Sequence, residues 1–167
     1  MKLEEFIPGV KYHGIETDKD AVFNGSVDLN GKTTITGAVV ENTEVVAATN
    51  VITAAESGKT FFLNALAGFE STLPAAAAGL HFRFIVKTAP TSNGYTITGS
   101  PVDKIFGTVA CSGAEDTVNG VTADAADNVI LVHNQAKIGD LVEFYSDGTN
   151  WYVTGNVNTY AAITANG

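Results

Sequence analysis

Residues 80–87 read Leu-His-Phe-Arg-Phe-Ile-Val-Lys, and this stretch indicates most directly how the chain folds. Every second position is apolar: Leu80, Phe82, Phe84 and Val86. The positions between them are His81, Arg83, Ile85 and Lys87. Because side chains alternate between the two faces of a β-strand, the first set is expected to face a core and the second to face outward. The stretch therefore predicts a strand in a sheet with one buried face.

The flanking sequence predicts more strands of the same kind. The candidates are residues 50–54, 59–64, 68–73, 80–88, 95–98, 102–107, 128–133, 140–146 and 150–155, all separated by turn-forming residues. Phe144, Trp151 and Val153 are expected to enter the core from two strands joined at the turn 147–150. The strongest helix signal, at 73–79, supports one turn at most. We predict an all-β chain whose residues 48–155 form an antiparallel β-sandwich or jelly-roll-like domain, with a tail at 156–167.

Residues 24–47 can be written as four hexads: NGSVDL, NGKTTI, TGAVVE and NTEVVA. The first three have Asn or Thr followed by Gly, and all four have Val or Thr at the fourth place. This pattern predicts a hexad-repeat β stem, in which short units stack on one another or on other chains. The expected trimer interface consists of Val27, Leu29, Ile35, Val39 and Val45. A plain hairpin around Asn30-Gly31 is the alternative.

Residues 1–23 are expected to form an extended N-terminal arm. Its apolar residues lie among turn formers and follow no regular period, so the arm has no core of its own. One interpretation is a loose terminus, and the other is an arm that becomes ordered on a partner. The second interpretation makes Phe6, Ile7, Val10 and Tyr12 the partner-binding residues.

Charge argues against two classes of partner. The 167 residues include 18 acidic and 9 basic side chains, which gives a net charge of −9. Binding to nucleic acid or to an anionic membrane surface requires clustered Lys and Arg, so neither partner is expected. No apolar run approaches the ~18 residues of a membrane-spanning helix. The first residues, Met-Lys-Leu-Glu-Glu-Phe, do not resemble a secretory signal, so synthesis in a cytoplasm is expected.

The sequence offers little for catalysis, and no cofactor or metal is expected. Cys111 and His133 form a conceivable pair, but an isolated Cys in a Ser-Gly-rich stretch is usually inert. Asp124 and Asp127 lack the ligand pattern of a calcium loop and are more typical of a solvated turn. Trp151 and Tyr152 suggest a sugar-stacking platform, although one of the two must face the core. We therefore predict that the protein is not an enzyme.

Three segments carry a resemblance to a known group of proteins. These are VITAAESGKTFFL at 51–63, TLPAAAAGL at 72–80 and GDLVEFYSDGTNWYV at 139–153. They resemble small β-domains of tailed-bacteriophage virion proteins, in which Leu-Pro-Ala and Ser-Asp-Gly-Thr-Asn-Trp-Tyr elements occur in fibre, spike and head-decoration proteins. The hexads are similar to fibre stems. The resemblance spans about residues 24–155 and implies a virion component, usually a homotrimer.

Three functions follow as hypotheses. The first is a structural capsid-decoration (cement) protein that binds the major capsid protein on the outer head surface as a homotrimer. It rests on the short chain, the arm and the assembly-type repeat, and it implies location in the virion after synthesis in the host cytoplasm. The second is a tail-fibre or receptor-binding component that recognises host-surface carbohydrate. The third is a free carbohydrate-binding module.

Overall fold

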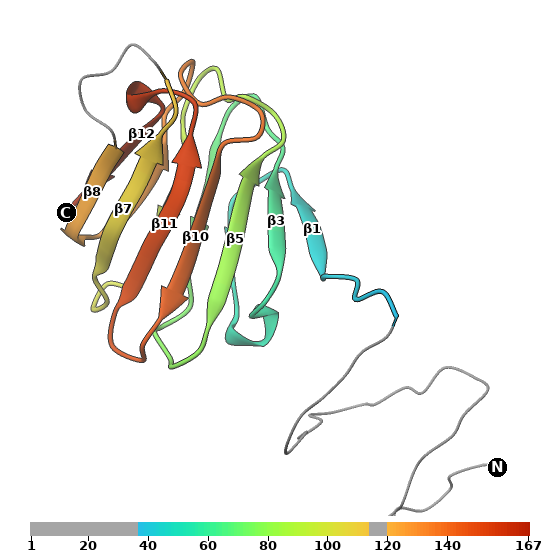
Figure 1. Cartoon of the computed structure of the whole chain (residues 1–167), viewed down its shortest axis with the longest axis vertical. Helices are drawn as coiled ribbons and strands as arrows, with labels where there is room; N and C mark the ends of the chain where they lie inside the picture. Colours follow the sequence, from blue (N-terminus) through green and yellow to red (C-terminus); the bar gives the residue numbers. More distant parts are fainter. Residues whose placement is uncertain (1–36, 114–119) are drawn as a thin grey trace, which may run out of the picture. The chain divides into compact units, whose positions relative to one another are not determined.

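A computed structural model of the chain describes residues 37–113 and 120–167. The chain divides into an amino-terminal unit, residues 1–39, and a second unit, residues 40–167, and the fold described below is that of the second unit (Figure 1). The predicted partner-binding residues of the arm, Phe6, Ile7, Val10 and Tyr12, lie outside the described residues, and so do Val27, Leu29 and Ile35. The second unit begins within the predicted stem and includes the predicted tail.

The described part of the second unit consists of strands, with two short 3-10 helices, η1 (Ala54–Glu56) and η2 (Tyr160–Ala162). One sheet contains β1 (Thr43–Val46), β3 (Thr60–Leu63), β5 (His81–Val86), β7 (Ile105–Cys111), β8 (Gly120–Ala126), β10 (Leu141–Ser146) and β11 (Trp151–Val157). The other contains β2 (Asn50–Val51), β4 (Phe69–Thr72), β6 (Tyr95–Thr98), β9 (Asn128–Leu131) and β12 (Ile163–Asn166).

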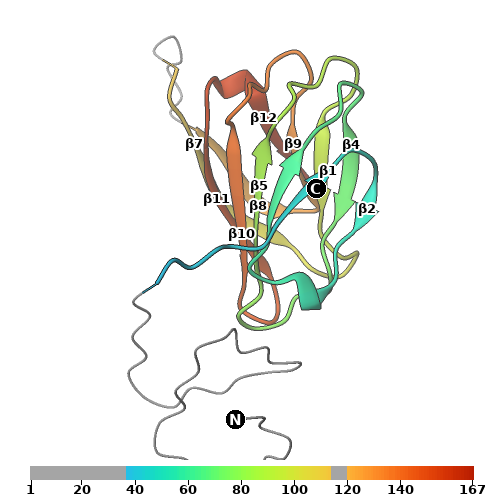
Figure 2. The same ribbon diagram turned by 90° about the vertical axis from the view of Figure 1, so that its right-hand side faces the viewer.

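The two sheets lie face to face, which confirms the predicted all-β sandwich (Figure 2). The seven-stranded sheet has the order β1-β3-β5-β10-β11-β7-β8, and Figure 1 views it face on. The five-stranded sheet has the order β12-β9-β6-β4-β2. All nine strands expected from the sequence are present; β6 has the expected bounds and the other eight have shifted ends.

Both sheets are mixed, whereas antiparallel sheets were expected. From β1 to β6 the chain passes to the opposite sheet after every strand, so consecutive strands within one sheet run in the same direction. Accordingly β1, β3 and β5 pair in parallel, and so do β2, β4 and β6. Hairpins within one sheet join β7 to β8 and β10 to β11. Alternation in the sequence identifies the buried face of a strand but not its neighbour, which is why the predicted antiparallel pairing was wrong for these strands.

The core lies between the sheets and is rich in aromatic rings. Phe84 of β5 stacks on Phe61 with ring centroids 5.3 Å apart, and it meets Phe144 of β10 edge-on at 5.7 Å. Phe82 packs on Trp151 at 5.7 Å. All five rings are at most 1% exposed, so the inward placement predicted for Phe82, Phe84, Phe144 and Trp151 is confirmed.

One side of the sandwich is closed and the other is open. At the closed side the chain crosses from β8 to β9 through Asp127, whose N–H donates to the carbonyl of Asn166 at the end of β12 (2.7 Å). At the open side, β1 pairs with β3 and β2 pairs with β4, and within residues 37–113 and 120–167 no strand pairs with their outer edges. The described sandwich therefore has two unpaired strand edges on the same side.

Candidate functional site

The outer face of the seven-stranded sheet carries a line of aromatic side chains. The strand register makes His81 the partner of Tyr145, Tyr145 the partner of Tyr152, and Tyr152 the partner of Phe106. These four residues come from β5, β10, β11 and β7, which are neighbours in the sheet. We call them the aromatic row. Residues at paired positions on adjacent strands point to the same face, so the fold aligns four side chains that are far apart in the sequence.

The aromatic row is ordered by ring contacts and remains open to solvent. His81 and Tyr145 stack with ring centroids 6.1 Å apart and planes 13° apart. Tyr152 and Phe106 lie 6.3 Å apart and are tilted by 33°. Tyr145 is 46% exposed and Tyr152 is 42% exposed, while the neighbouring Trp151 is fully buried. Of the two residues suggested as a sugar platform, Tyr152 faces outward and Trp151 belongs to the core.

Hydrogen bonds at the β10–β11 hairpin fix the position of the Tyr152 ring. The first oxygen of Asp147, Oδ1, accepts the backbone N–H groups of Thr149 (2.8 Å) and Asn150 (2.9 Å), which shapes the turn. The Tyr152 hydroxyl donates to the second oxygen, Oδ2, at 2.9 Å. The turn N–H groups of Asn150 and Thr149, followed by the Tyr152 hydroxyl, lower the pKa of Asp147. The same hydroxyl bond to the carboxylate raises the pKa of Tyr152.

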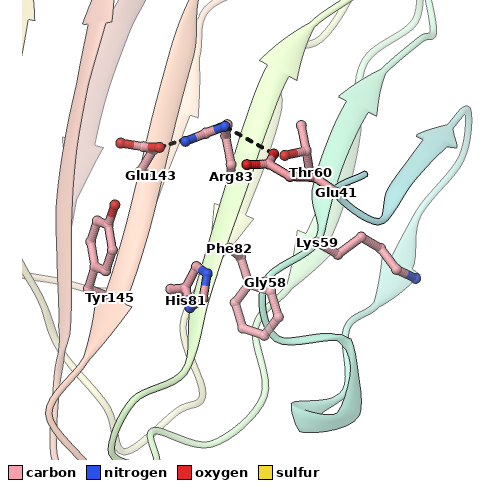
Figure 3. Close-up of a pocket in the computed structure, with 9 residues that line it drawn as sticks. All are labelled: Glu41, Gly58, Lys59, Thr60, His81, Phe82, Arg83, Glu143 and Tyr145. Atoms are coloured by element: carbon pink, nitrogen blue, oxygen red, sulfur yellow. Dashed lines mark hydrogen bonds and ion pairs between the residues drawn. The ribbon is translucent and has the colours of Figure 1, made fainter. Parts of the chain in front are cut away.

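A polar hollow of about 200 Å³ adjoins the His81 end of the aromatic row (Figure 3). Arg83 lies between two carboxylates there, with its Nε 2.6 Å from Glu143 Oε1 and its Nη1 3.4 Å from Glu41 Oε2. Arg83 and Glu143 are register partners on β5 and β10, two pairs along from His81 and Tyr145 and therefore on the same face. Its hydrogen bond to Glu143 raises the pKa of Arg83. Two residues of the aromatic row, His81 and Tyr145, thus border one hollow together with Phe82 and a paired guanidinium.

A second ion-pair group lies at the edge of the hollow. Lys59 Nζ contacts Glu44 Oε2 and Glu56 Oε1, both at 2.8 Å. Glu56 also accepts the backbone N–H and the hydroxyl of Thr53, each at 2.9 Å, which caps η1. The hydrogen bond from Lys59 is the main cause of the low pKa of Glu56, about 2. Both cationic side chains that line the hollow are therefore neutralised by carboxylates.

The other end of the same face carries aliphatic and aromatic side chains. Val45, Phe62, Ile85 and Leu141 are consecutive register partners on β1, β3, β5 and β10, and we call them the apolar row. Val45 is 50% exposed, and the other three are partly exposed. The apolar row begins at the unpaired edge of β1. On β2, the other open edge, Val51 is 72% exposed.

Two of the predicted trimer-interface residues fall within the described chain. Val39 is 70% exposed and Val45 is 50% exposed, and only Val45 belongs to the sandwich unit. The sequence reasoning missed Phe62 and Leu141 as surface residues. It did place Ile85 on the face opposite to Phe84, which was the available signal for an outward apolar position.

The residues considered for catalysis or metal binding are dispersed. Cys111 ends β7 in the seven-stranded sheet, whereas His133 follows β9 of the five-stranded sheet. Asp127 forms an ion pair with Lys104. In the parts of the chain that the structure describes, no group of three or more His, Cys, Asp or Glu is placed to hold a metal ion. The same residues contain no helix with the length and apolarity needed to cross a membrane.

Comparison with known proteins adds no relative. No family model, no curated protein and no solved structure matches the chain.

Proposed function

We propose that this chain is a structural protein of a tailed-bacteriophage virion, which decorates the outer capsid surface as a homotrimer and binds the major capsid protein. The observation that carries the assembly part is the apolar row, which begins at the unpaired edge of β1 and continues over three further strands. The virion part is supported by the resemblance of residues 51–63, 72–80 and 139–153 to phage β-domains.

The edge of β1 has little protection against pairing with another chain. Natural sheets protect exposed edges with lysines, prolines or bulges. The sequence of β1 is Thr-Glu-Val-Val, and its one charged residue, Glu44, contacts Lys59 of the same sandwich. An edge of this kind next to an exposed apolar row is typical of a surface that is covered in an assembly.

Three-fold symmetry would cover this surface and keep the assembly finite. In the proposed trimer the β1 edge of one copy meets a different surface of the next copy, which makes the contact head-to-tail. A head-to-tail contact produces a closed ring when its rotation closes, and a trimer is the smallest such ring because a two-fold dimer uses the same patch on both copies. In such a ring the β1 edge and apolar row of each copy would contact one neighbour, and another surface of the same copy would contact the β1 edge and apolar row of the other neighbour.

The oligomeric state of two matched variants tests the assembly. Val45→Arg places a charge on the apolar row, whereas Val102→Arg makes the same change at a valine that is 83% exposed in the turn before β7. At micromolar concentration, light scattering should give three times 17.4 kDa for the wild type and for Val102→Arg. Val45→Arg should be a folded monomer by circular dichroism. A folded wild-type monomer, or a trimeric Val45→Arg variant, would refute the proposal.

The receptor-binding hypothesis is a second candidate because of a different observation. The aromatic row lies on the outer face of the sheet with two of its tyrosines more than 40% exposed. Decoration and receptor recognition are compatible, since the apolar row and the aromatic row lie at opposite ends of the strands.

A further inference from the structure

We infer that the aromatic row and the adjoining Arg83–Glu143 pair form a binding site for an uncharged oligosaccharide. The inference is independent of the capsid-decoration proposal, because it requires neither a trimer nor a capsid. It rests on the alignment of exposed rings, on the polar groups beside them and on the charge balance of the hollow.

The rings form an extended apolar platform. The aromatic row crosses four neighbouring strands in the sheet order β5-β10-β11-β7. Adjacent strands are about 4.8 Å apart, so the two ends of the row are separated by roughly 14 Å. This length suits several linked sugar rings better than one monosaccharide. The C–H faces of pyranose rings pack on aromatic side chains, whose hydroxyl or imidazole groups stay available for polar contacts. The platform therefore has the length and chemistry of an oligosaccharide site.

The platform is also ordered before a ligand arrives. His81 and Tyr145 hold each other by stacking, and Tyr152 is held by its bond to Asp147. Binding to such a surface loses less conformational entropy than binding to a flexible loop, which increases affinity.

Polar groups for sugar hydroxyls lie directly beside the rings. The ion pairs of Arg83 engage Nε and Nη1, and a guanidinium has five N–H donors. Donors therefore remain after the contacts made by the described residues. Glu143 uses Oε1 for Arg83 and has a second carboxylate oxygen that can accept. A neighbouring donor and acceptor match two adjacent hydroxyl groups on one sugar ring.

The charge balance favours a neutral ligand over an anionic one. Arg83 is paired with Glu143 and Glu41, and Lys59 is paired with Glu44 and Glu56. Each cation at the hollow thus has two carboxylates, and the whole chain carries a net charge of −9. A phosphorylated, sulfated or uronic-acid-rich glycan would be repelled. Neutral hexose or pentose chains meet no such penalty.

Native affinity electrophoresis tests this site with named probes. The gels contain one neutral polysaccharide each (dextran, mixed-linkage β-glucan, galactomannan or xyloglucan) or one anionic polysaccharide (alginate or hyaluronan). The wild type should be retarded by at least one neutral probe and by neither anionic probe. Retardation by the anionic probes alone, or by none of the six, would overturn the inference.

Matched tyrosine variants locate the site. Tyr145→Ala and Tyr152→Ala should each raise the dissociation constant obtained from the retardation about tenfold. This change is near the upper range of the binding energy of a single aromatic contact. Tyr152→Phe, which keeps the ring and loses the bond to Asp147, should weaken it less. Tyr160→Ala removes a tyrosine that is 41% exposed in η2, away from the aromatic row, and should bind as the wild type. Equal binding by Tyr152→Ala and the wild type, with both folded by circular dichroism, would refute the assignment.

Discussion

The hydroxyl of Tyr95 joins two loops at one end of the sandwich, and its removal has a predictable cost. Tyr95 begins β6 and is 1% exposed. Its oxygen accepts the backbone N–H of Ala65 at 2.8 Å and lies 2.7 Å from the carbonyl oxygens of both Ala65 and Thr88. The single hydroxyl proton can serve one carbonyl at a time. Tyr95→Phe removes these contacts and leaves the ring in place.

The expected loss follows from the groups left unpaired. The Ala65 N–H loses its acceptor, and the bond donated to a carbonyl also disappears, which together cost about 2 kcal/mol. For a chain of 167 residues, this corresponds to a fall in Tm of roughly 4–8 °C. Urea denaturation should show a lower midpoint with an unchanged slope. Tyr145→Phe is the control, because Tyr145 is 46% exposed and its stability change should stay within about 0.5 kcal/mol.

The same residue predicts a pH dependence. Burial raises the pKa of Tyr95 above its ordinary value of 10.0. A group whose pKa is raised in the folded state contributes its stability fully below the unfolded pKa and loses it as pH rises through the folded pKa. The stability advantage of the wild type over Tyr95→Phe should therefore shrink above pH 10. A Tm difference below 1 °C at neutral pH, or an advantage that grows with alkaline pH, would contradict this account of the hydroxyl.

Two further predictions concern a glycine and the arm. Gly107 has φ +134°, and an added Cβ would lie 2.0 Å from the Val153 carbonyl oxygen. Gly107→Ala should therefore lower the free energy of unfolding by more than about 3 kcal/mol or prevent folding. The control Gly79→Ala, at φ +84° with open space around it, should lower it by only about 1–2 kcal/mol in the same urea denaturation assay. Deletion of residues 2–22 should abolish co-sedimentation with undecorated capsids and leave the melting temperature unchanged; wild-type occupancy by the truncated protein would assign attachment to the sandwich instead.

The sequence predicted strands best where alternation was strong. In β5 the four positions from Phe82 to Ile85 alternate between core and surface as expected. Three strands were not predicted as such, for different reasons. β8 is rich in Gly, Ala and Asp, which have low strand propensity, and it forms because β7 offers an edge. β12 lies in the segment interpreted as a tail, and β1 was included in the hexad repeat.

The candidate site depended on information that a single strand does not contain. Tyr152 was noticed because it follows Trp151, and alternation required one of the two to face outward. Its alignment with His81, Tyr145 and Phe106 depends on the register of four strands, two of which pair in parallel across a long separation in sequence. The β7 strand also contains a register irregularity between Ile105 and Gly107, which alternation alone does not reveal. The rings were therefore visible in the sequence, but their arrangement was not.

The crossing pattern from β1 to β6 has a mechanical consequence. The strand pairs β1/β2, β3/β4 and β5/β6, each with one strand in each sheet, lie side by side in chain order starting from the open edges, so β3 becomes an edge strand only after β1 has left. Tension on the amino-terminal end can release the sandwich one strand pair at a time. Tension on the carboxyl end first removes β12, an edge strand of the five-stranded sheet, and then reaches β11, which lies between β10 and β7 and cannot leave without splitting the seven-stranded sheet. A sandwich pulled from its amino-terminal end would thus yield in small steps, whereas one pulled from its carboxyl end would lose β12 and then resist until the seven-stranded sheet splits.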